Sequence, residues 1–179
     1  MSDFTVRALV MRAARYKDYD KVLTLFAQGH GRVTATARGC MRPKAALRAL
    51  CEPLVYAEFA LVERMGRCTV TGGQMLDPFY DLRKDVQRLA AASLLMQLAE
   101  GSVREGLAGD ETLSCLLRAF ADLAYGERGA LEQLPGHMLA VLEVIGYKPP
   151  VAVRRDDLHA LITFAERCVE YRLKAAALL

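Results

Sequence analysis

The residues best suited to chemistry lie in the stretch Arg32–Arg48, which holds five cations and no acidic residue. The cations are Arg32, Arg38, Arg42, Lys44 and Arg48. Lysine and arginine that reach a nucleic-acid backbone gain affinity because each neutralised phosphate releases counterions. The alternative is that these are ordinary solvated cations, but for Arg38, Arg42 and Lys44 we favour phosphate binding. The stretch therefore predicts a surface that binds a polyanion.

Cations and aromatic residues nearer the N-terminus extend this candidate surface. The additional cations are Arg12, Arg15, Lys17 and Lys21. Arg12 and Lys21 join the predicted binding set, whereas Arg15 and Lys17 fit a contact and an exposed turn equally well. Tyr16, Tyr19 and His30 have rings that can stack on bases. An aromatic residue in such a loop is more often a packing residue, so both interpretations stay open.

The sequence offers little for covalent catalysis or metal binding. His30, His137 and His159 are scattered, and no Ser or Cys stands in a recognisable nucleophile setting. Two acids, Asp18 and Asp20, could ligate a metal, but two acids in a polar turn usually serve only the turn. There is no Walker A pattern, and the five cysteines show no Cys-x-x-Cys spacing. We therefore expect no enzyme activity, no cofactor, no metal and no disulfide framework.

Five β-like segments must position the cations. They are Phe4–Ala14, Lys21–Ala27, Arg32–Arg38, Leu54–Glu63 and Cys68–Leu76. Alternation places Val33, Ala35 and Ala37 on one face of the third, and Gly72 with Gly73 predicts a bulge in the fifth. Five strands with a long connection after the third are typical of an OB-fold barrel, although other small barrels fit the pattern too. The basic stretch then forms the loop between strands three and four.

The second half of the chain has helical periodicity. We expect helices at Leu82–Glu100, from Asp110, at Leu131–Ile145 and at Leu158–Ala177. Asp77 and Pro78 mark the change, since Asp caps helices and Pro suits a first turn. Pro135 predicts a helix start or a kink. The fold class is α+β, with an OB-fold barrel at residues 1–76 and an all-α helical bundle at 77–179.

Charge is distributed unevenly along the chain, whose net charge is +3. Residues 1–80 carry 12 Lys and Arg against 7 Asp and Glu, and residues 81–179 carry 12 against 14. The first half is thus at +5 and the second at −2, which points to a polyanion partner for the first half. No stretch is apolar enough to span a bilayer and we find no signal peptide. We expect a cytoplasmic, nucleoid-associated protein.

Several segments in this order resemble RecO, the family of bacterial recombination mediators. The resemblance rests on ALVMRAARYKDYDKVLTLFAQGHGRVTATARGCMRPK, LCEPLVYAEFALVERMGR and MLDPFYDLRKDVQRLAAASLLMQLAE, and more weakly on LAVLEVIGYKP and CVEYRLK. It implies an OB-fold followed by a helical domain. It also implies binding of single- and double-stranded DNA, strand annealing, and loading of RecA onto strands coated with single-stranded DNA-binding protein (SSB). The implied partners are RecR and the acidic C-terminal tail of SSB.

One departure concerns metal. Many RecO proteins carry a cysteine-rich, zinc-binding insertion after a Gly-Tyr that matches Gly146 and Tyr147. Here the link Lys148–Asp157 has no cysteine, so we do not expect the zinc site of those relatives in this chain.

The SSB tail ends in acids, a hydrophobic residue and a carboxylate, and would need an apolar pocket rimmed by cations. Candidate residues are Leu117, Arg118, Phe120, Arg154 and Arg155, although for each singly a core or surface role is the simpler interpretation. The other hypothesis for the whole chain is a protein–protein adaptor whose OB-fold does not bind DNA.

Overall fold

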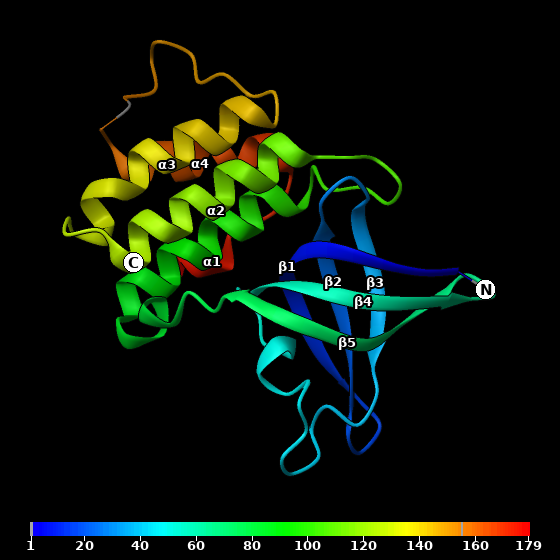
Figure 1. Ribbon diagram of the computed structural model, residues 1–179. Helices are drawn as coiled ribbons and strands as arrows, with labels where there is room; N and C mark the ends of the chain where they lie inside the picture. The colour runs from blue at the N-terminus through cyan, green and yellow to red at the C-terminus, as the bar shows by residue number, and fades with distance from the viewer. Residues whose placement is uncertain (1, 155) are drawn as a thin grey trace. The chain divides into compact units, whose positions relative to one another are not determined.

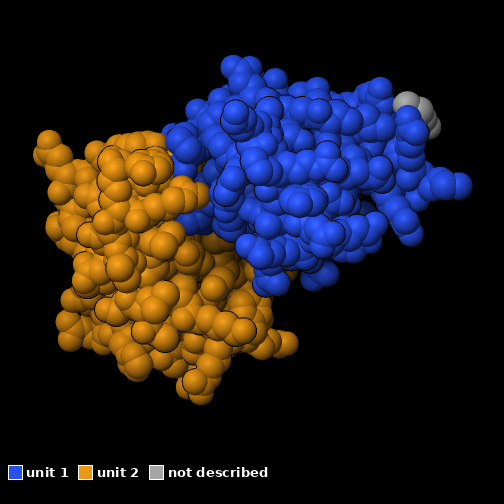
Figure 2. Space-filling view, turned by 90° about the horizontal axis from the view of Figure 1, so that it is seen from below, with its two compact units in different colours: residues 1–78, 103–110 blue, residues 79–102, 111–179 orange. Residues whose placement is uncertain are grey.

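The computed structural model describes residues 2–154 and 156–179, and the chain divides into two compact units (Figure 2). The first comprises residues 1–78 and 103–110. The second comprises residues 79–102 and 111–179. A segment from the middle of the chain thus belongs to the N-terminal unit.

The first unit is built on a closed barrel of five strands (Figure 1). The strands are β1 (Ser2–Tyr16), β2 (Asp20–Ala27), β3 (Gly31–Ala37), β4 (Tyr56–Arg64) and β5 (Arg67–Asp77). Their order around the barrel is β1-β2-β3-β5-β4, with β3 and β5 parallel and the other pairs antiparallel. The predicted five-stranded, OB-like architecture is confirmed.

Alternating apolar residues fill the barrel. Val6, Ala8 and Val10 of β1 and Ala35 and Ala37 of β3 are buried in one cluster. The pairing of β1 with β2 shifts between Val10 and Arg12, and Met11 at the shift is also buried. The pairing of β4 with β5 shifts where Ala60 lies opposite Gly72 and Leu61 opposite Val70, so the extra residue lies beside the predicted glycine bulge.

The connection between β3 and β4 closes one part of the barrel core. It contains a short 3-10 helix, Ala49–Cys51, whose Leu50 and Cys51 are buried with Cys40 in the barrel cluster. The cations Arg42, Lys44 and Arg48 on the same connection are exposed. The predicted loop between strands three and four is therefore a plug with a charged outer side.

Residues 103–110 pack against the start of β3. The backbone N–H of Arg32 donates to the carbonyl of Arg104 at 3.0 Å, and that of Gly106 to the carbonyl of His30 at 3.2 Å. Gly31 has φ +70, and a Cβ there would lie 2.2 Å from the carbonyl oxygens of Arg104 and Leu107. Glycine is required at this position because the two backbones approach so closely.

The second unit is helical. Its elements are η2 (Tyr80–Lys84), α1 (Val86–Glu100), α2 (Asp110–Tyr125), α3 (Ala130–Val144), α4 (Leu158–Val169) and η3 (Lys174–Leu178). Helix α1 contacts α3, η2 and η3, and its alanines and all of its leucines except Leu89 are buried around much of its circumference. Among the described residues, no helix is both long and apolar enough to cross a membrane.

Two sequence predictions about helix ends are wrong, and one of two alternatives is excluded. Asp77 ends β5, and α1 is instead capped by Asp85, whose carboxylate accepts from the N–H of Arg88 at 3.0 Å. Pro135 lies inside α3, which begins at Ala130, so the alternative that it marks the helix start is excluded. Helix α4 ends at Val169 and not at Ala177, because Glu170 takes a left-handed conformation with φ 62.

Candidate nucleic-acid interface

Three arginines gather in a hollow on the outer face of the barrel. The hollow has a volume of about 360 Å³ and is lined by Arg38, Val62, Arg64, Arg67, Thr69 and Thr71. The register explains this grouping: Arg64 pairs with Arg67, Val62 with Thr69, and β3 runs parallel to β5 with Ala37 beside Val70. Side chains alternate along a strand, so these residues face outward while Leu61 and Val70 face the core.

The hollow is suited to an anion. Arg38, Arg64 and Arg67 are all exposed, and none of them forms an ion pair with another described residue. Guanidinium groups match phosphate oxygens through paired hydrogen bonds. The Thr69 hydroxyl can add a further donor, whereas the Thr71 hydroxyl donates to the carbonyl of Ala60 at 3.2 Å. Three unpaired guanidinium groups beside two threonines can therefore hold a phosphodiester backbone.

A second cationic surface lies at the β1–β2 turn. Tyr16 and Tyr19 are 48% and 49% exposed, so each presents a ring to solvent. Lys17 lies 5.3 Å from the centre of the Tyr16 ring, and the Arg42 guanidinium lies 5.6 Å from that of Tyr19. Exposed rings paired with cations are what single-stranded nucleic acid needs for base stacking and phosphate contact.

Hydrogen bonds fix this turn to the β3–β4 connection. The N–H of Met41 donates to the Tyr19 carbonyl at 2.9 Å, and the N–H of Gly39 donates to the Asp20 carboxylate at 2.7 Å. Asp20, one of the two acids considered as metal ligands, thus has a structural role as a hydrogen-bond acceptor. The tyrosines of one turn and the arginine of another are consequently held in one arrangement.

The structure separates the predicted DNA-binding cations by environment. Arg12, Arg38, Arg42, Lys44 and Arg48 are exposed, and Arg32 is half-buried. Arg38 belongs to the hollow and Arg42 to the tyrosine surface. Lys21 differs, because its Nζ donates to the carbonyl of Cys51 at 3.1 Å and to Glu52 at 2.8 Å. Its side chain is only 13% exposed, so it tethers the plug and has little surface to offer a ligand.

Sequence reasoning missed Arg64 and Arg67. Both lie in the short stretch RMGR between the predicted strands Leu54–Glu63 and Cys68–Leu76, outside the basic stretch Arg32–Arg48. The signal that could have found them is the antiparallel register itself, since residues flanking a two-residue turn face one another. Combined with the parallel β3–β5 pairing, that register brings Arg38 into the same group.

The Cys51 thiol of the plug is unreactive in character. Burial, together with the neighbouring thiol of Cys40, raises the pKa of Cys51 to about 12. A thiol protonated at neutral pH is a poor nucleophile and a poor metal ligand. Within the described parts of the chain, no three His, Cys, Asp or Glu residues are grouped as a metal site would require.

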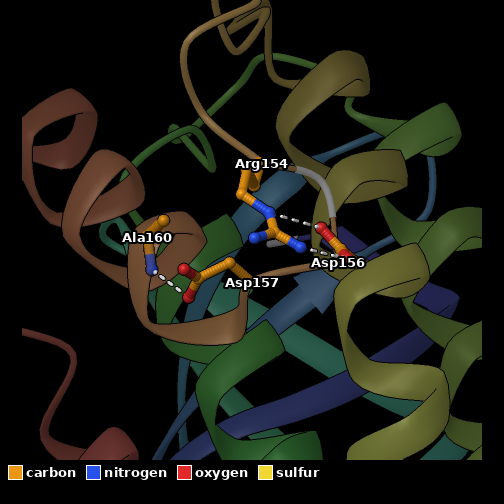
Figure 3. A network of polar contacts seen from close by, with 4 residues as sticks. All are labelled: Arg154, Asp156, Asp157 and Ala160. Atoms are coloured by element: carbon orange, nitrogen blue, oxygen red, sulfur yellow. Dashed lines mark hydrogen bonds and ion pairs between the residues drawn. The ribbon is translucent and has the colours of Figure 1, made fainter.

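The helical unit contains an apolar groove of about 570 Å³ between the segment preceding α4 and that helix. It is lined by Pro150, Ala152, Val153, Ala160, Thr163, Phe164, Arg167 and Cys168. Asp157 caps α4 by accepting from the N–H of Ala160 at 3.0 Å, and the Arg154 guanidinium pairs with Asp156 at 3.0 Å (Figure 3). The cap holds the first turn of α4, where the groove begins.

Of the residues predicted for a partner contact, the four that the structure describes do not line this groove. Phe120 is fully buried and packs edge-on against Phe79, so its ring belongs to the core and has no exposed surface for a partner. Leu117 is half-buried and Arg118 exposed on α2. Arg154 is exposed and paired with Asp156, and Arg155 lies outside the described residues. The groove's own cation is Arg167, which sequence reasoning did not select.

The comparison with known proteins agrees with the barrel architecture. Residues 1–79 match the family model described as Recombination protein O N terminal. A curated DNA repair protein RecO from Acetivibrio thermocellus is 27% identical over 152 residues, which cover 85% of this chain and 61% of that protein. The corresponding protein of Syntrophomonas wolfei is 33% identical over 157 residues, covering 85% of this chain and 62% of that protein.

A third relative, the DNA repair protein RecO of Alkaliphilus metalliredigens, is 31% identical over 140 residues, with 78% of this chain and 57% of that protein covered. The chain therefore spans about three fifths of the length of the curated relatives it matches. The matches extend well beyond residue 79 and so include the helical unit as well as the barrel. Residues 1–79 therefore match the N-terminal domain of the RecO family, and most of the chain is similar to curated RecO proteins.

Proposed function

We propose that the chain is a DNA-binding recombination mediator that acts in DNA repair without covalent chemistry. The observation that carries the proposal is the hollow formed by Arg38, Arg64 and Arg67 on the outer face of the barrel. The relatives named DNA repair protein RecO support the process. The cation-flanked Tyr16 and Tyr19 support single-stranded DNA as one ligand.

The proposed mechanism is strand annealing by charge neutralisation. The arginines of the hollow hold the phosphates of one strand, while the exposed tyrosines of the β1–β2 turn stack on its bases. A strand whose phosphates are neutralised repels a complementary strand less, so pairing proceeds faster. Double-stranded DNA is held through its backbone by the same cations.

The helical unit is proposed to provide the protein contacts. Its apolar groove, with Arg167 in the lining, has the chemistry that the SSB tail requires: an apolar wall for a hydrophobic residue and a cation for a carboxylate. Such a contact would bring the protein to SSB-coated strands, where RecR and RecA loading complete the role implied by the family. RecR contact is proposed on family grounds alone.

Titration of a fluorescent single-stranded oligonucleotide at several salt concentrations tests the DNA-binding step. The change Arg38→Glu, Arg42→Glu and Lys44→Glu is expected to weaken binding at least about tenfold, since phosphate contacts dominate such affinity. The matched control reverses Arg118, Arg128 and Arg172 of the helical unit to Glu, which changes the net charge equally and should leave affinity within about twofold.

Two outcomes would decide against the proposal. Absence of oligonucleotide binding by the unaltered chain, even at low salt, would leave the adaptor hypothesis, in which the barrel's cations serve an acidic protein. Equal losses in the barrel variant and the control variant would show that net charge acts without a defined site. Retention of the thermal unfolding temperature in both variants checks that neither change unfolds its unit.

A further inference from the structure

The hairpin between β4 and β5 has an unusual tip. Arg64 pairs with Arg67, so the turn consists of Met65 and Gly66 alone. Both residues have positive φ, 50° for Met65 and 69° for Gly66. Two-residue hairpin turns with this backbone prefer Asn-Gly or Asp-Gly, because those residues adopt the left-handed region readily.

Met65 fits neither its backbone nor its surroundings. A side chain without a short polar group is disfavoured at positive φ. The side chain is also fully exposed at 101% of its reference area, so no packing compensates for the backbone conformation. A residue kept in a strained and solvated position suggests a role in contacting something outside the chain.

The charges around the tip indicate the chemistry of that contact. Arg64 directly precedes Met65 and Arg67 follows Gly66, and together with Arg38 these two arginines line the hollow. Glu63 precedes Arg64 and so lies on the opposite face of β4. An apolar side chain between two guanidinium groups complements an apolar base step bordered by two phosphates. Methionine is among the residues that proteins insert between bases.

We propose that the β4–β5 hairpin is a wedge, with Met65 inserting against the last base pair at a junction of single- and double-stranded DNA. This rests on the proposed DNA binding and deepens it by naming the preferred DNA structure. Arg64 and Arg67 hold the phosphates on either side of the opened step. Unstacking is least costly where a duplex ends, so the wedge favours a junction over continuous duplex.

The test compares Met65→Asn with the unaltered full chain. Asparagine is favoured in this turn, so the variant keeps the hairpin and should melt at the same temperature or higher. We expect its affinity for forked DNA to fall about tenfold and its affinity for a single-stranded oligonucleotide to stay within about twofold. Met65→Leu, which restores an apolar side chain, should recover most of the fork affinity.

A fork carrying 2-aminopurine at its last base pair gives a direct readout, because the fluorescence of this base rises when it is unstacked. The unaltered chain and Met65→Leu should raise the fluorescence, and Met65→Asn should not. An equal rise with Met65→Asn, or equal fork affinity, would overturn the wedge while leaving DNA binding intact. Failure of the unaltered chain to bind any oligonucleotide would instead overturn the proposed function.

A membrane surface is the competing occupant, since an apolar tip flanked by arginines could also approach anionic lipid. Sedimentation with phosphatidylglycerol vesicles tests it with the same three proteins. Vesicle binding that Met65→Asn abolishes, combined with an unchanged 2-aminopurine signal, would assign the tip to lipid and overturn the proposal. No vesicle binding by any of the three proteins, with the fluorescence pattern expected above, supports it.

Discussion

Lys21 carries a charge whose partners lie within the barrel unit. Its ammonium group bonds the carbonyl of Cys51 and the carboxylate of Glu52, so it fastens the plug between β3 and β4 to β2. The sequence placed Lys21 among the DNA-binding cations because only residue type and strand position were visible. Its 13% exposure and its two bonds to the plug assign it a structural role.

Replacing Lys21 by Met is expected to lower the free energy of unfolding by about 1–2 kcal/mol. The change leaves the Cys51 carbonyl without its ammonium donor, and hydrogen bonds to charged groups contribute on this scale. Urea denaturation measures the loss, and oligonucleotide affinity should change little. The matched control, Lys44→Met, removes an exposed cation of the β3–β4 connection. It should lower the oligonucleotide affinity and leave the free energy of unfolding unchanged. If Lys21→Met instead lowered the oligonucleotide affinity strongly and left the free energy of unfolding unchanged, Lys21 would be a DNA-binding residue.

His137 couples the stability of the helical unit to pH. Burial lowers the pKa of His137, nearby Arg128 lowers it further, and Asp122, whose Oδ2 lies 3.8 Å from Nε2, opposes the shift. The unfolded chain therefore binds a proton at a higher pH than the folded chain, and stability should decline as pH falls below about 6.5. Urea denaturation at pH 7.5 and 5.5 should show a smaller decline for His137→Gln. Exposed His159→Gln is the control, and an equal decline in all three proteins would exclude this role for His137.

At the scale of elements, the close contact of β3 with residues 103–110 depends on Gly31. Gly31→Ala should be strongly destabilising, because its Cβ would meet two carbonyl oxygens at 2.2 Å in a backbone region already unfavourable for alanine. Gly29→Ala is the matched control, since Gly29 has a similar φ of +72 but open space around it.

Hydrogen exchange separates the two effects. In Gly31→Ala, the amides of Arg32 and Gly106, which bond across the contact, should lose protection. In Gly29→Ala these two amides should keep most of their protection. This variant should lower the free energy of unfolding only by the cost of placing alanine at a positive φ. Equal exchange in the two variants would mean that backbone conformation, and not the close approach, limits this position.

The elements that the sequence predicted well are those specified by local pattern. Val33, Ala35 and Ala37 alternate in one strand, and the glycines of the β2–β3 turn separate it from its neighbour, so strand and turn follow from neighbouring residues. The helix end at Glu170 was missed because CVEYRLK continues a helical pattern. The helix ends there because Glu170 adopts a left-handed conformation, and the sequence has no glycine at that position to indicate a helix end.

The candidate site could be predicted only in part, because it depends on pairings between distant segments. Arg38 was found from its place in a basic run. Arg64 and Arg67 join it only through the β3–β5 and β4–β5 registers, which local sequence does not specify. Phe120 was selected as an apolar residue near a cation, but burial against Phe79 is a tertiary property.

For the whole molecule, the positions of the charged residues matter more for binding than the net charge. The chain's net charge is only +3, yet residues 1–80 carry +5 and residues 81–179 carry −2. A polyanion attracted by net charge alone would be held weakly and would lose its attraction at physiological salt, where screening acts within about 8 Å. Binding that survives such salt must come from cations grouped as they are in the arginine hollow.

If the hollow binds DNA as proposed, the salt dependence of binding counts the phosphates that it contacts. For single-stranded DNA, the slope of log affinity against log salt concentration changes by about 0.7 for each phosphate contacted. Replacing Arg38, Arg64 and Arg67 together by Gln should flatten this slope by about 2 and lower affinity most at low salt. A titration of the same oligonucleotide at salt concentrations between about 50 and about 300 mM measures both the slope and the affinity. If affinity fell by a constant factor at every salt concentration, the three arginines would act through the fold of the barrel and not through phosphate contacts, and the hollow would be rejected as the binding surface.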